Sequence, residues 1–245
     1  MKISIISDIH VHPDKSQGLD ILKQFCRNSK VMSSDLVVLL GDIFDLMVYD
    51  FSEYEKLYRS ALIEIQNLID TGVKVVFVEG NHDFCLQYFF KNIFPDKNFY
   101  YFKNGFNLNT GDQLISFFHG DTIEIENNFY RFYRTIIKSS LVRSFYQTVV
   151  GFDRVWAIGS YFLNKSHDRH RKYSENFNSE EVREKFRKSA DKFFETSKSD
   201  ILICGHSHLK DNYVKNQKSY LNNGFAQFEK TFIYIDEFDC SFHLL

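Results

Sequence analysis

Four short apolar runs, each stopped by a small residue and then a polar one, constrain the fold of this chain more than any other feature. They are residues 3–6 before Ser7-Asp8, 35–40 before Gly41-Asp42, 73–79 before Gly80-Asn81, and 201–204 before Gly205-His206. Such short continuous runs are typical of strands buried on both faces. Apolar residues at helical spacing over 17–30 and 53–69 separate the first three runs. Strands that alternate with helices predict an α/β layered fold.

Two other stretches predict further strands. Residues 99–118 contain short β-rich segments that we expect to be joined by hairpin turns at Asn104-Gly105 and Thr110-Gly111. The tail, 211–245, also has strand-like segments, with a turn at Asn222-Asn223-Gly224.

Length, composition and charge exclude several classes of protein. The chain has 245 residues, of which 44% are hydrophobic and 25% charged, which excludes a disordered chain, a collagen and a coiled coil. This length allows one large domain or two small ones, and we expect a single domain over 1–245. Because the net charge is only −2, we expect no nucleic-acid partner, and nothing in the sequence predicts a protein partner.

The stretch 126–172 predicts a helical insertion with two different faces. Apolar and basic residues both follow helical spacing: Phe129, Phe132, Tyr133, Ile136 and Ile137 on one face, and Arg131, Arg134 and Lys138 on another. Nine basic and three acidic residues give this stretch +6, so the remainder of the chain carries −8. An apolar face beside a basic face suits an amphiphile carrying phosphates, or an anionic membrane surface. The alternative is a helix packed on its own domain with solvated charges.

The N-terminus and the cysteines predict a cellular compartment. The first apolar run is too short for the core of an export signal, and no stretch of about 18 uncharged apolar residues predicts a transmembrane helix. The four cysteines are scattered, with no C-x-x-C pair. We therefore expect reduced thiols in a cytoplasmic protein that can still contact a membrane surface.

Five short signatures follow the predicted strands and carry the chemistry. They are Asp8-Ile-His10, Gly41-Asp42-Ile-Phe-Asp45, Gly80-Asn81-His82-Asp83, His119-Gly120-Asp121 and Gly205-His206-Ser207-His208. In an open α/β sheet, the loops after the strands form the ligand crevice, so we expect all five to converge there. Asp45 and Asp83 are expected to orient ligands or fix a loop.

The residue types in these signatures predict a metal centre. The candidate ligands are Asp8, His10, Asp42, Asn81, His119, His206 and His208. Carboxylate, amide and imidazole ligands suit manganese, iron, cobalt or zinc. Seven candidate ligands are more than one tetrahedral zinc ion needs. Two ions about 3.5–4 Å apart clamp a phosphoryl group and lower the pKa of a water molecule. We expect two divalent ions, manganese before iron, cobalt or zinc.

This set of motifs resembles the calcineurin-like metallophosphoesterases. The resemblance implies a four-layer α/β fold in which two packed mixed β-sheets are flanked by helices. It implies one metal held by Asp8, His10, Asp42 and His208, and another held by Asp42, Asn81, His119 and His206, with Asp42 bridging. It also implies that His82 contacts the phosphate or protonates the leaving oxygen, so Asp42 and His82 are the expected catalytic residues.

A narrower resemblance is to the UDP-2,3-diacylglucosamine pyrophosphohydrolases of lipid A synthesis. Length, the insertion after His119-Gly120-Asp121-Thr122 and the segment from Trp156 to Ser166 carry it. The resemblance implies a lid over the metals, an acylated nucleotide-sugar substrate, the products UMP and 2,3-diacylglucosamine 1-phosphate, and contact with the inner membrane. The expected substrate-binding residues are Asn81, His82, Asn127, Asn164, Lys165, Ser166, Arg169 and His206.

One departure keeps other functions open. The narrower family commonly has Gly-Asn-Arg-Asp where this chain has Gly-Asn-His-Asp at 80–83. The alternatives are a metallophosphoesterase acting on another nucleotide, phospholipid or phosphoprotein, and a metal-binding scaffold without catalysis.

Overall fold

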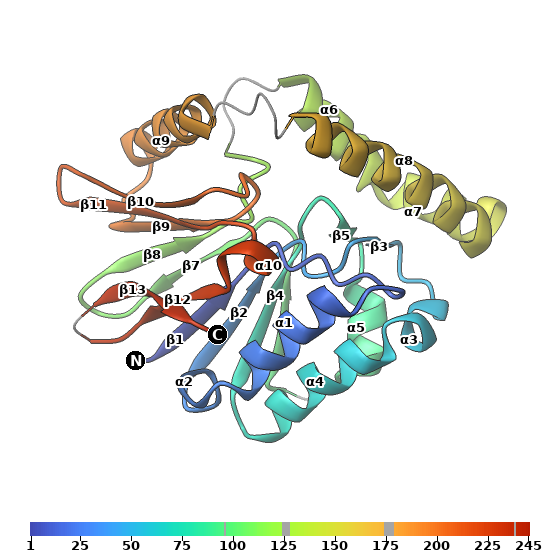
Figure 1. The fold of residues 1–245 in the computed structure, drawn as a ribbon, viewed down its shortest axis with the longest axis horizontal. Coiled ribbons are helices and arrows are strands. Elements are labelled where there is room, and N and C mark those ends of the chain that lie inside the picture. The colour runs from blue at the N-terminus through green and yellow to red at the C-terminus, as the bar shows by residue number, and fades with distance from the viewer. Residues whose placement is uncertain (96, 124–127, 174–178, 238) are drawn as a thin grey trace.

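Two mixed β-sheets packed face to face form the centre of the computed structural model (Figure 1). The structure describes residues 1–95, 97–123, 128–173, 179–237 and 239–245, without the side chains of 128–131, 162 and 164–173. No helix within these ranges is long and apolar enough to cross a membrane.

The first sheet has six strands in the order β13-β12-β1-β2-β4-β6. Its strands are β1 (Ile3–Ile6), β2 (Leu36–Leu40), β4 (Lys74–Val78), β6 (Phe99–Phe102), β12 (Thr231–Ile235) and β13 (Cys240–Leu244). β1, β2, β4 and β6 run parallel to one another, whereas β12 and β13 are antiparallel additions beside β1. The ends of β1, β2 and β4 therefore lie at one edge of the sheet.

The second sheet has five strands in the order β10-β11-β9-β8-β7. Its strands are β7 (Phe106–Asn109), β8 (Leu114–Phe117), β9 (Ile201–Cys204), β10 (Lys210–Lys215) and β11 (Lys218–Asn223). β8, β9 and β11 are parallel, and β7 and β10 pair antiparallel at the two edges. A small parallel pair joins the loops that follow β2 and β4. It consists of β3 (Met47–Val48) and β5 (Asp83–Phe84).

Helices cover the outer faces of both sheets and complete four layers (Figure 1). α1 (Ser16–Arg27), α4 (Arg59–Asp70) and α5 (Gln87–Ile93) pack on the six-stranded sheet, and α9 (Ser179–Thr196) packs on the five-stranded sheet. The short helices are α2 (Ser29–Met32), α3 (Glu53–Leu57) and α10 (Ala226–Glu229). α1 buries Gly18, Ile21, Leu22, Phe25 and Cys26, the i, i+3, i+4 spacing of an amphipathic helix. The expected four-layer fold is confirmed.

The insertion forms a group of helices beside the strand ends, at the upper right in Figure 1. It contains α6 (Asn128–Ile137), α7 (Ser140–Phe145), a π-helical turn (Tyr146–Val150) and α8 (Phe152–Tyr173). Tyr146 stacks on Tyr49 with ring centroids 5.1 Å apart, and Phe152 packs edge-on against Phe51 and Tyr54. The boundaries of the single domain, 1–245, and of the lid, 126–172, stay predictions.

Three local features differ from the sequence expectations. β6 and β7 do not form a hairpin, because β6 pairs with β4 and β7 pairs with β8 in the other sheet. The turn at Asn104-Gly105 therefore carries the chain from one sheet to the other. The sequence patterns described above do not predict α9, nor α10, which has only four residues.

Alternating side chains of the strands build the core between the sheets. Leu36, Val38 and Leu40 of β2 face the second sheet, whereas Val37 and Leu39 face the helices. Alternate side chains of a strand point to opposite faces, and both faces of β2 are buried. Its sequence is therefore apolar at every position and does not alternate with polar residues.

Ile233, a fully buried residue of β12, tests this core. Ile233→Ala is expected to lower the free energy of unfolding by about 2–4 kcal/mol, because it leaves a cavity between two sheets that cannot collapse. Urea denaturation at equilibrium measures the change. Ile63→Ala, on α4 with 48% of the residue exposed, is the matched control and is expected to change stability by about 0.5 kcal/mol or less. Equal effects at both positions would contradict the account of the core.

Candidate metal centre

The loops after five strands meet at one place, where backbone hydrogen bonds hold them side by side. The loop after β1 donates from Asp8 N to the Gly41 carbonyl at 3.1 Å and from His10 N to the Asp42 carbonyl at 3.0 Å. The loop after β9 donates from Gly205 N to the His119 carbonyl at 2.8 Å. These contacts continue the parallel pairing of the strands and bring together residues far apart in the sequence.

One group of candidate ligands lies where the loops after β1, β2 and β9 meet. It contains Asp8, His10, Asp42 and His208, whose ligand atoms all lie within 4.8 Å of one another. His10 Nε2 is 3.3 Å from His208 Nε2 and 3.8 Å from Asp42 Oδ2, and His208 Nε2 is 3.4 Å from Asp8 Oδ1. This is the set that the sequence predicts for the first metal.

A second group shares Asp42 with the first. Asp42, His119 and His206 offer ligand atoms within 4.8 Å of one another. His119 Nε2 lies 3.4 Å from Asp42 Oδ2 and 3.1 Å from Asn81 Oδ1, which adds the amide oxygen of the predicted set. The structure thus brings all seven candidate ligands together, with Asp42 between the two groups. Their roles as ligands stay predictions.

The backbone of these loops is strained at the candidate ligands themselves. Five of them have a positive φ: Asp8 (53°), His10 (50°), Asp42 (52°), His206 (67°) and His208 (57°). Non-glycine residues rarely adopt this left-handed conformation, and it is concentrated at functional sites, where the surrounding structure enforces it. The strain is evidence that the positions of these side chains, and not only their identities, are fixed by the fold.

Gly80 and Gly205 are required by the crowding of the loops. A Cβ at Gly80 would collide with Asp42 Oδ1, and a Cβ at Gly205 would collide with Asp8 Oδ2. Both glycines therefore let the backbone approach a candidate carboxylate ligand closely.

Asp83 fixes the loop that carries Asp42. Its buried carboxylate accepts hydrogen bonds from four backbone N–H groups, those of Asp42, Ile43, Phe44 and Gly80, at 2.7–3.1 Å. The loop-fixing role expected for this residue is therefore visible in its contacts.

The charges of the centre are set by burial and by mutual contacts. Burial raises the pKa of Asp42, but the facing His119 and His82 outweigh it and hold that pKa well below the usual value. Burial lowers the pKa of His119, but Asp42 outweighs this effect and raises it to about 10. Burial also lowers the pKa of His10 and His206, which leaves both rings neutral at pH 7 with a lone pair for a metal.

The residues present fit a pair of divalent cations. Carboxylate, amide and imidazole atoms converge in a buried space, an arrangement that is costly unless positive charge lies among them. When bound, two such ions polarise phosphoryl oxygens and activate water for attack on phosphorus. The metal itself is not identified by this donor set, which suits manganese, iron, cobalt and zinc alike.

His82 lies next to the first group of ligands and is held in place. Its Nδ1 lies 2.9 Å from the Asp45 carbonyl, its backbone N–H donates to Asp42 Oδ1 at 2.9 Å, and its ring packs edge-on against His10. Asp45 also approaches His10, with 3.4 Å between Oδ1 and Nδ1. The expected catalytic residue thus lies beside the candidate ligands.

Two basic residues of the insertion contact the loops of the centre. Arg134 Nε donates to Asp121 Oδ2 at 2.7 Å, directly after the His119 loop. Lys138 Nζ donates to the Gly80 carbonyl at 2.9 Å and lies 3.0 Å from Glu79 Oε2. These two cations of the basic face therefore bind the protein's own buried acids and are not the solvated charges of the alternative interpretation.

The other substrate contacts expected from the sequence cannot be placed. Asn127 lies outside the described residues, and so do the side chains of Asn164, Lys165, Ser166 and Arg169 on α8. Asn81, His82 and His206 lie at the centre, as described above.

Sequence reasoning missed Glu79 and Asn222. Glu79 is buried at the end of β4 and binds Tyr101 and the Cys85 N–H as well as Lys138. Asn222, also buried, donates from Nδ2 to the Gly205 carbonyl at 2.6 Å and so supports the His206 loop. Both are polar residues at or next to a strand end, the same signal that identified the ligands.

A comparison with protein families decides the identity of the chain. The model of the calcineurin-like phosphoesterases matches residues 1–210. The chain belongs to this family. Members are metal-dependent hydrolases of phosphoric esters, so the enzyme class expected from the sequence is confirmed for this phosphoesterase.

The chain is also similar, at modest identity, to individual proteins. A UDP-2,3-diacylglucosamine hydrolase of Wigglesworthia glossinidia brevipalpis is 24% identical over 229 residues, which are 90% of this chain and 84% of that protein. One from Neisseria gonorrhoeae (strain ATCC 700825 / FA 1090) is 34% identical over 137 residues, covering 54% of this chain and 53% of that protein. The solved structure of an archaeal phosphodiesterase aligns over all of both chains with 14% identity and a TM-score of 0.49.

Replacing Asp42 tests whether one carboxylate serves both groups of ligands. Asp42→Ala is expected to abolish turnover and to reduce the metal content, because each group loses an oxygen ligand. Elemental analysis by mass spectrometry gives the metal per chain, and Asp20→Ala, an exposed position on α1, is the control. Full activity in Asp42→Ala would contradict a two-metal site.

Asp83→Asn tests the loop contacts without changing a candidate ligand. The amide group introduced by the substitution would face backbone N–H donors from which the Asp83 carboxylate accepts hydrogen bonds. Because some of these donors would lose their acceptor, the free energy of unfolding is expected to fall by about 2–6 kcal/mol. Manganese affinity is expected to fall as well, because the loop holding Asp42 loosens. Asp70→Asn, on the exposed end of α4, is the matched control for denaturation and for manganese titration. Unchanged stability and affinity would rule out the proposed role of Asp83.

Proposed function

We propose that this phosphoesterase cleaves the pyrophosphate of UDP-2,3-diacylglucosamine, a lipid-linked nucleotide sugar, to UMP and 2,3-diacylglucosamine 1-phosphate. Asp8, His10, Asp42, Asn81, His119, His206 and His208 hold two divalent ions, with manganese the first expectation. His82 donates a proton to the oxygen of the leaving phosphate, since it lies beside the candidate ligands within reach of a bound phosphoryl group.

The exposed apolar surface of the insertion is the observation that carries this proposal. Large apolar side chains of α6, α7, the π-helical turn and α8 are open to solvent: Phe132, Tyr133, Ile136, Leu141, Phe145, Val149, Ile158 and Tyr161. Phe132 is 66% exposed and Leu141 82%. Soluble monomers rarely leave so many apolar residues exposed on adjacent elements unless the surface binds something.

The insertion is also attached to the loops that carry the chemistry. Arg134 binds Asp121, and Lys138 binds Glu79 and the Gly80 carbonyl. An acyl chain lying on this apolar surface would therefore keep its phosphates near the ligands. The names of the relatives, which act on UDP-2,3-diacylglucosamine, support the same substrate.

The same surface supports a position at a membrane. An amphiphilic substrate resides in a bilayer, and an apolar helical surface flanked by basic residues suits the interface of an anionic leaflet. We place the protein at the cytoplasmic face of an inner membrane, with Asn127, Asn164, Lys165, Ser166 and Arg169 as proposed substrate contacts of the lid.

His82 favours a second candidate function. It stands where the narrower family commonly has arginine, and its ring is held by the Asp45 carbonyl at 2.9 Å. A phosphoesterase acting on another nucleotide, phospholipid or phosphoprotein would use the same centre without needing that arginine.

Hydrolysis of UDP-2,3-diacylglucosamine by the purified chain with Mn²⁺ tests the proposal. We expect release of UMP and of the lipid phosphate in equal amounts. Cleavage of a generic aryl phosphodiester without either product would keep the dimetal hydrolase and reject this substrate. Inactivity on both would contradict the enzyme assignment.

Changes to the lid test whether its apolar surface holds the acyl chains. Phe132→Ser combined with Tyr133→Ser is expected to raise KM for the diacylated substrate about tenfold, since two large apolar contacts are lost. Turnover of the aryl phosphodiester should be unchanged. Val214→Ser, a substitution at an exposed apolar position on β10, is the control. Intact kinetics on the lipid substrate in the double variant would reject the acyl-binding role.

A further inference from the structure

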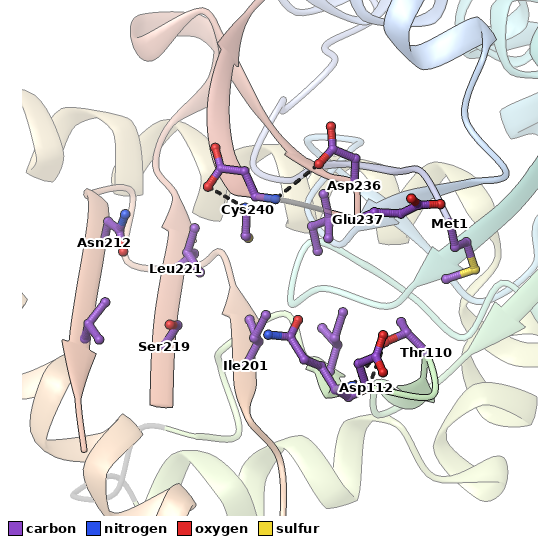
Figure 2. Close-up of a pocket in the computed structure, with 15 residues that line it drawn as sticks. Met1, Thr110, Asp112, Ile201, Asn212, Ser219, Leu221, Asp236, Glu237 and Cys240 are labelled. Carbon is purple, nitrogen blue, oxygen red and sulfur yellow. Dashed lines mark hydrogen bonds between the residues drawn. The ribbon is translucent and has the colours of Figure 1, made fainter. Parts of the chain in front are cut away.

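Two cavities in the molecule differ in position and in charge. The larger, about 600 Å³, lies away from the candidate ligands, between residues of β9–β11 on one side and Met1, Asp236 and Cys240 on the other (Figure 2). Its lining includes the carboxylates of Asp112, Asp236, Glu237 and Asp239. Because these repel phosphate, this cavity does not suit an anionic substrate.

The smaller cavity, about 400 Å³, adjoins the metal centre. His10, His82 and His208 form part of its wall. The remainder comes from His12 and Asp45 in the loops after β1 and β2, from the start of α1 and from the segment before β12. Its volume lies within the range of about 300–1,000 Å³ that small-molecule sites occupy. A group bonded to a phosphorus at the metal centre can therefore extend into this space.

The side chains around this cavity suit a nucleotide. Lys15 and His12 supply positive or polar groups for a phosphate, while the acid among the described lining residues, Asp45, lies against His10. Phe225 offers an aromatic ring whose position is fixed by stacking on His208, with centroids 5.2 Å apart and planes at 22°. Flat rings of this kind are the usual platform for a nucleobase.

Two amide side chains complete the lining. Gln227 Nε2 donates to the carbonyls of Ile9 at 2.6 Å and His10 at 3.2 Å, which fixes its side chain at the cavity. Gln17 is exposed at the first turn of α1. The donors of Gln227 are therefore engaged, and it is Gln17 that presents a donor and an acceptor side by side. Such a pair matches the edge of a pyrimidine base better than it matches an acyl chain.

None of the described lid residues lines this cavity, although the lid contacts two loops that also border it, those after β2 and β4. Arg134 and Lys138 of the lid bind the segments after β8 and β4, at Asp121 and Gly80. The cavity borders the loops after β2 and β4 at Asp45 and His82, and it is bounded otherwise by α1, which follows β1, and by Phe225 and Gln227, which follow β11. A substrate with phosphates at the centre would therefore have separate places for an apolar tail and for a nucleoside.

We propose that this cavity is the binding site for the nucleoside monophosphate half of the substrate, with Lys15 binding its phosphate and Gln17 and Phe225 recognising the base. The inference rests on the proposed function, because the half of the substrate opposite the acyl chains is then UMP. His82, in the cavity wall, faces the half that leaves. Lys15 and Gln17 thus determine specificity at this site and lie outside the metal ligands.

Calorimetric titration of the full chain with UMP in the presence of Mn²⁺ tests this site, with AMP and inorganic phosphate as competing probes. Lys15→Ala combined with Gln17→Ala is expected to weaken UMP binding at least tenfold and to remove the preference for UMP over AMP. KM for the UDP-linked lipid should rise while kcat changes little. Lys23→Ala combined with Gln24→Ala, on the same helix but away from the cavity, is the matched control and should bind UMP normally.

The outcomes separate this site from the proposed substrate. UMP binding that is lost in the double variant supports the site, even if the diacylated substrate is never hydrolysed. Normal UMP affinity and normal KM in the double variant, alongside hydrolysis of the lipid, overturn the site and leave the substrate intact. Failure of the wild-type chain to bind UMP, or equal binding of UMP, AMP and phosphate, also overturns it.

Discussion

Burial of carboxylates and imidazoles together is the constraint on which the rest of this structure depends. Asp8, Asp42, His10 and His119 are almost inaccessible to solvent, yet their polar atoms lie within a few ångströms of one another. Such a cluster is unfavourable unless its groups are paired with one another or with cations. The fold holds it in place through Asp83 and through left-handed backbone at the ligands themselves. The two packed sheets are rigid, so the loops at their edge can keep this strained backbone conformation.

The lid is joined to this edge by charge and not only by apolar packing. Arg134 and Lys138 neutralise Asp121 and Glu79, two buried acids that neighbour the ligand loops. Both cations belong to the basic face that the sequence predicts to suit phosphates or an anionic membrane surface. Their engagement means that the position of the lid is coupled to the loops of the metal centre, while its exposed apolar residues remain for another molecule.

Much of the site could be predicted because its signals are local. A buried strand followed by a small residue and a ligand is visible in the sequence, and five such signatures identified all seven residues that the structure brings together. What the sequence could not predict depends on long-range pairing. The turn at Asn104-Gly105 looks like a hairpin, but β6 and β7 pair with different partners. In the sequence, Glu79 is only the last residue of an apolar strand run. Its contacts with Lys138 and Tyr101 form only when the chain folds.

The central claim is that two ions lie on either side of Asp42. Anomalous diffraction from crystals of the full chain grown with Mn²⁺ tests it most directly. We expect two peaks about 3.5–4 Å apart, one beside Asp8, His10 and His208 and the other beside Asn81, His119 and His206. A single peak, or two peaks that do not share Asp42, would contradict the account.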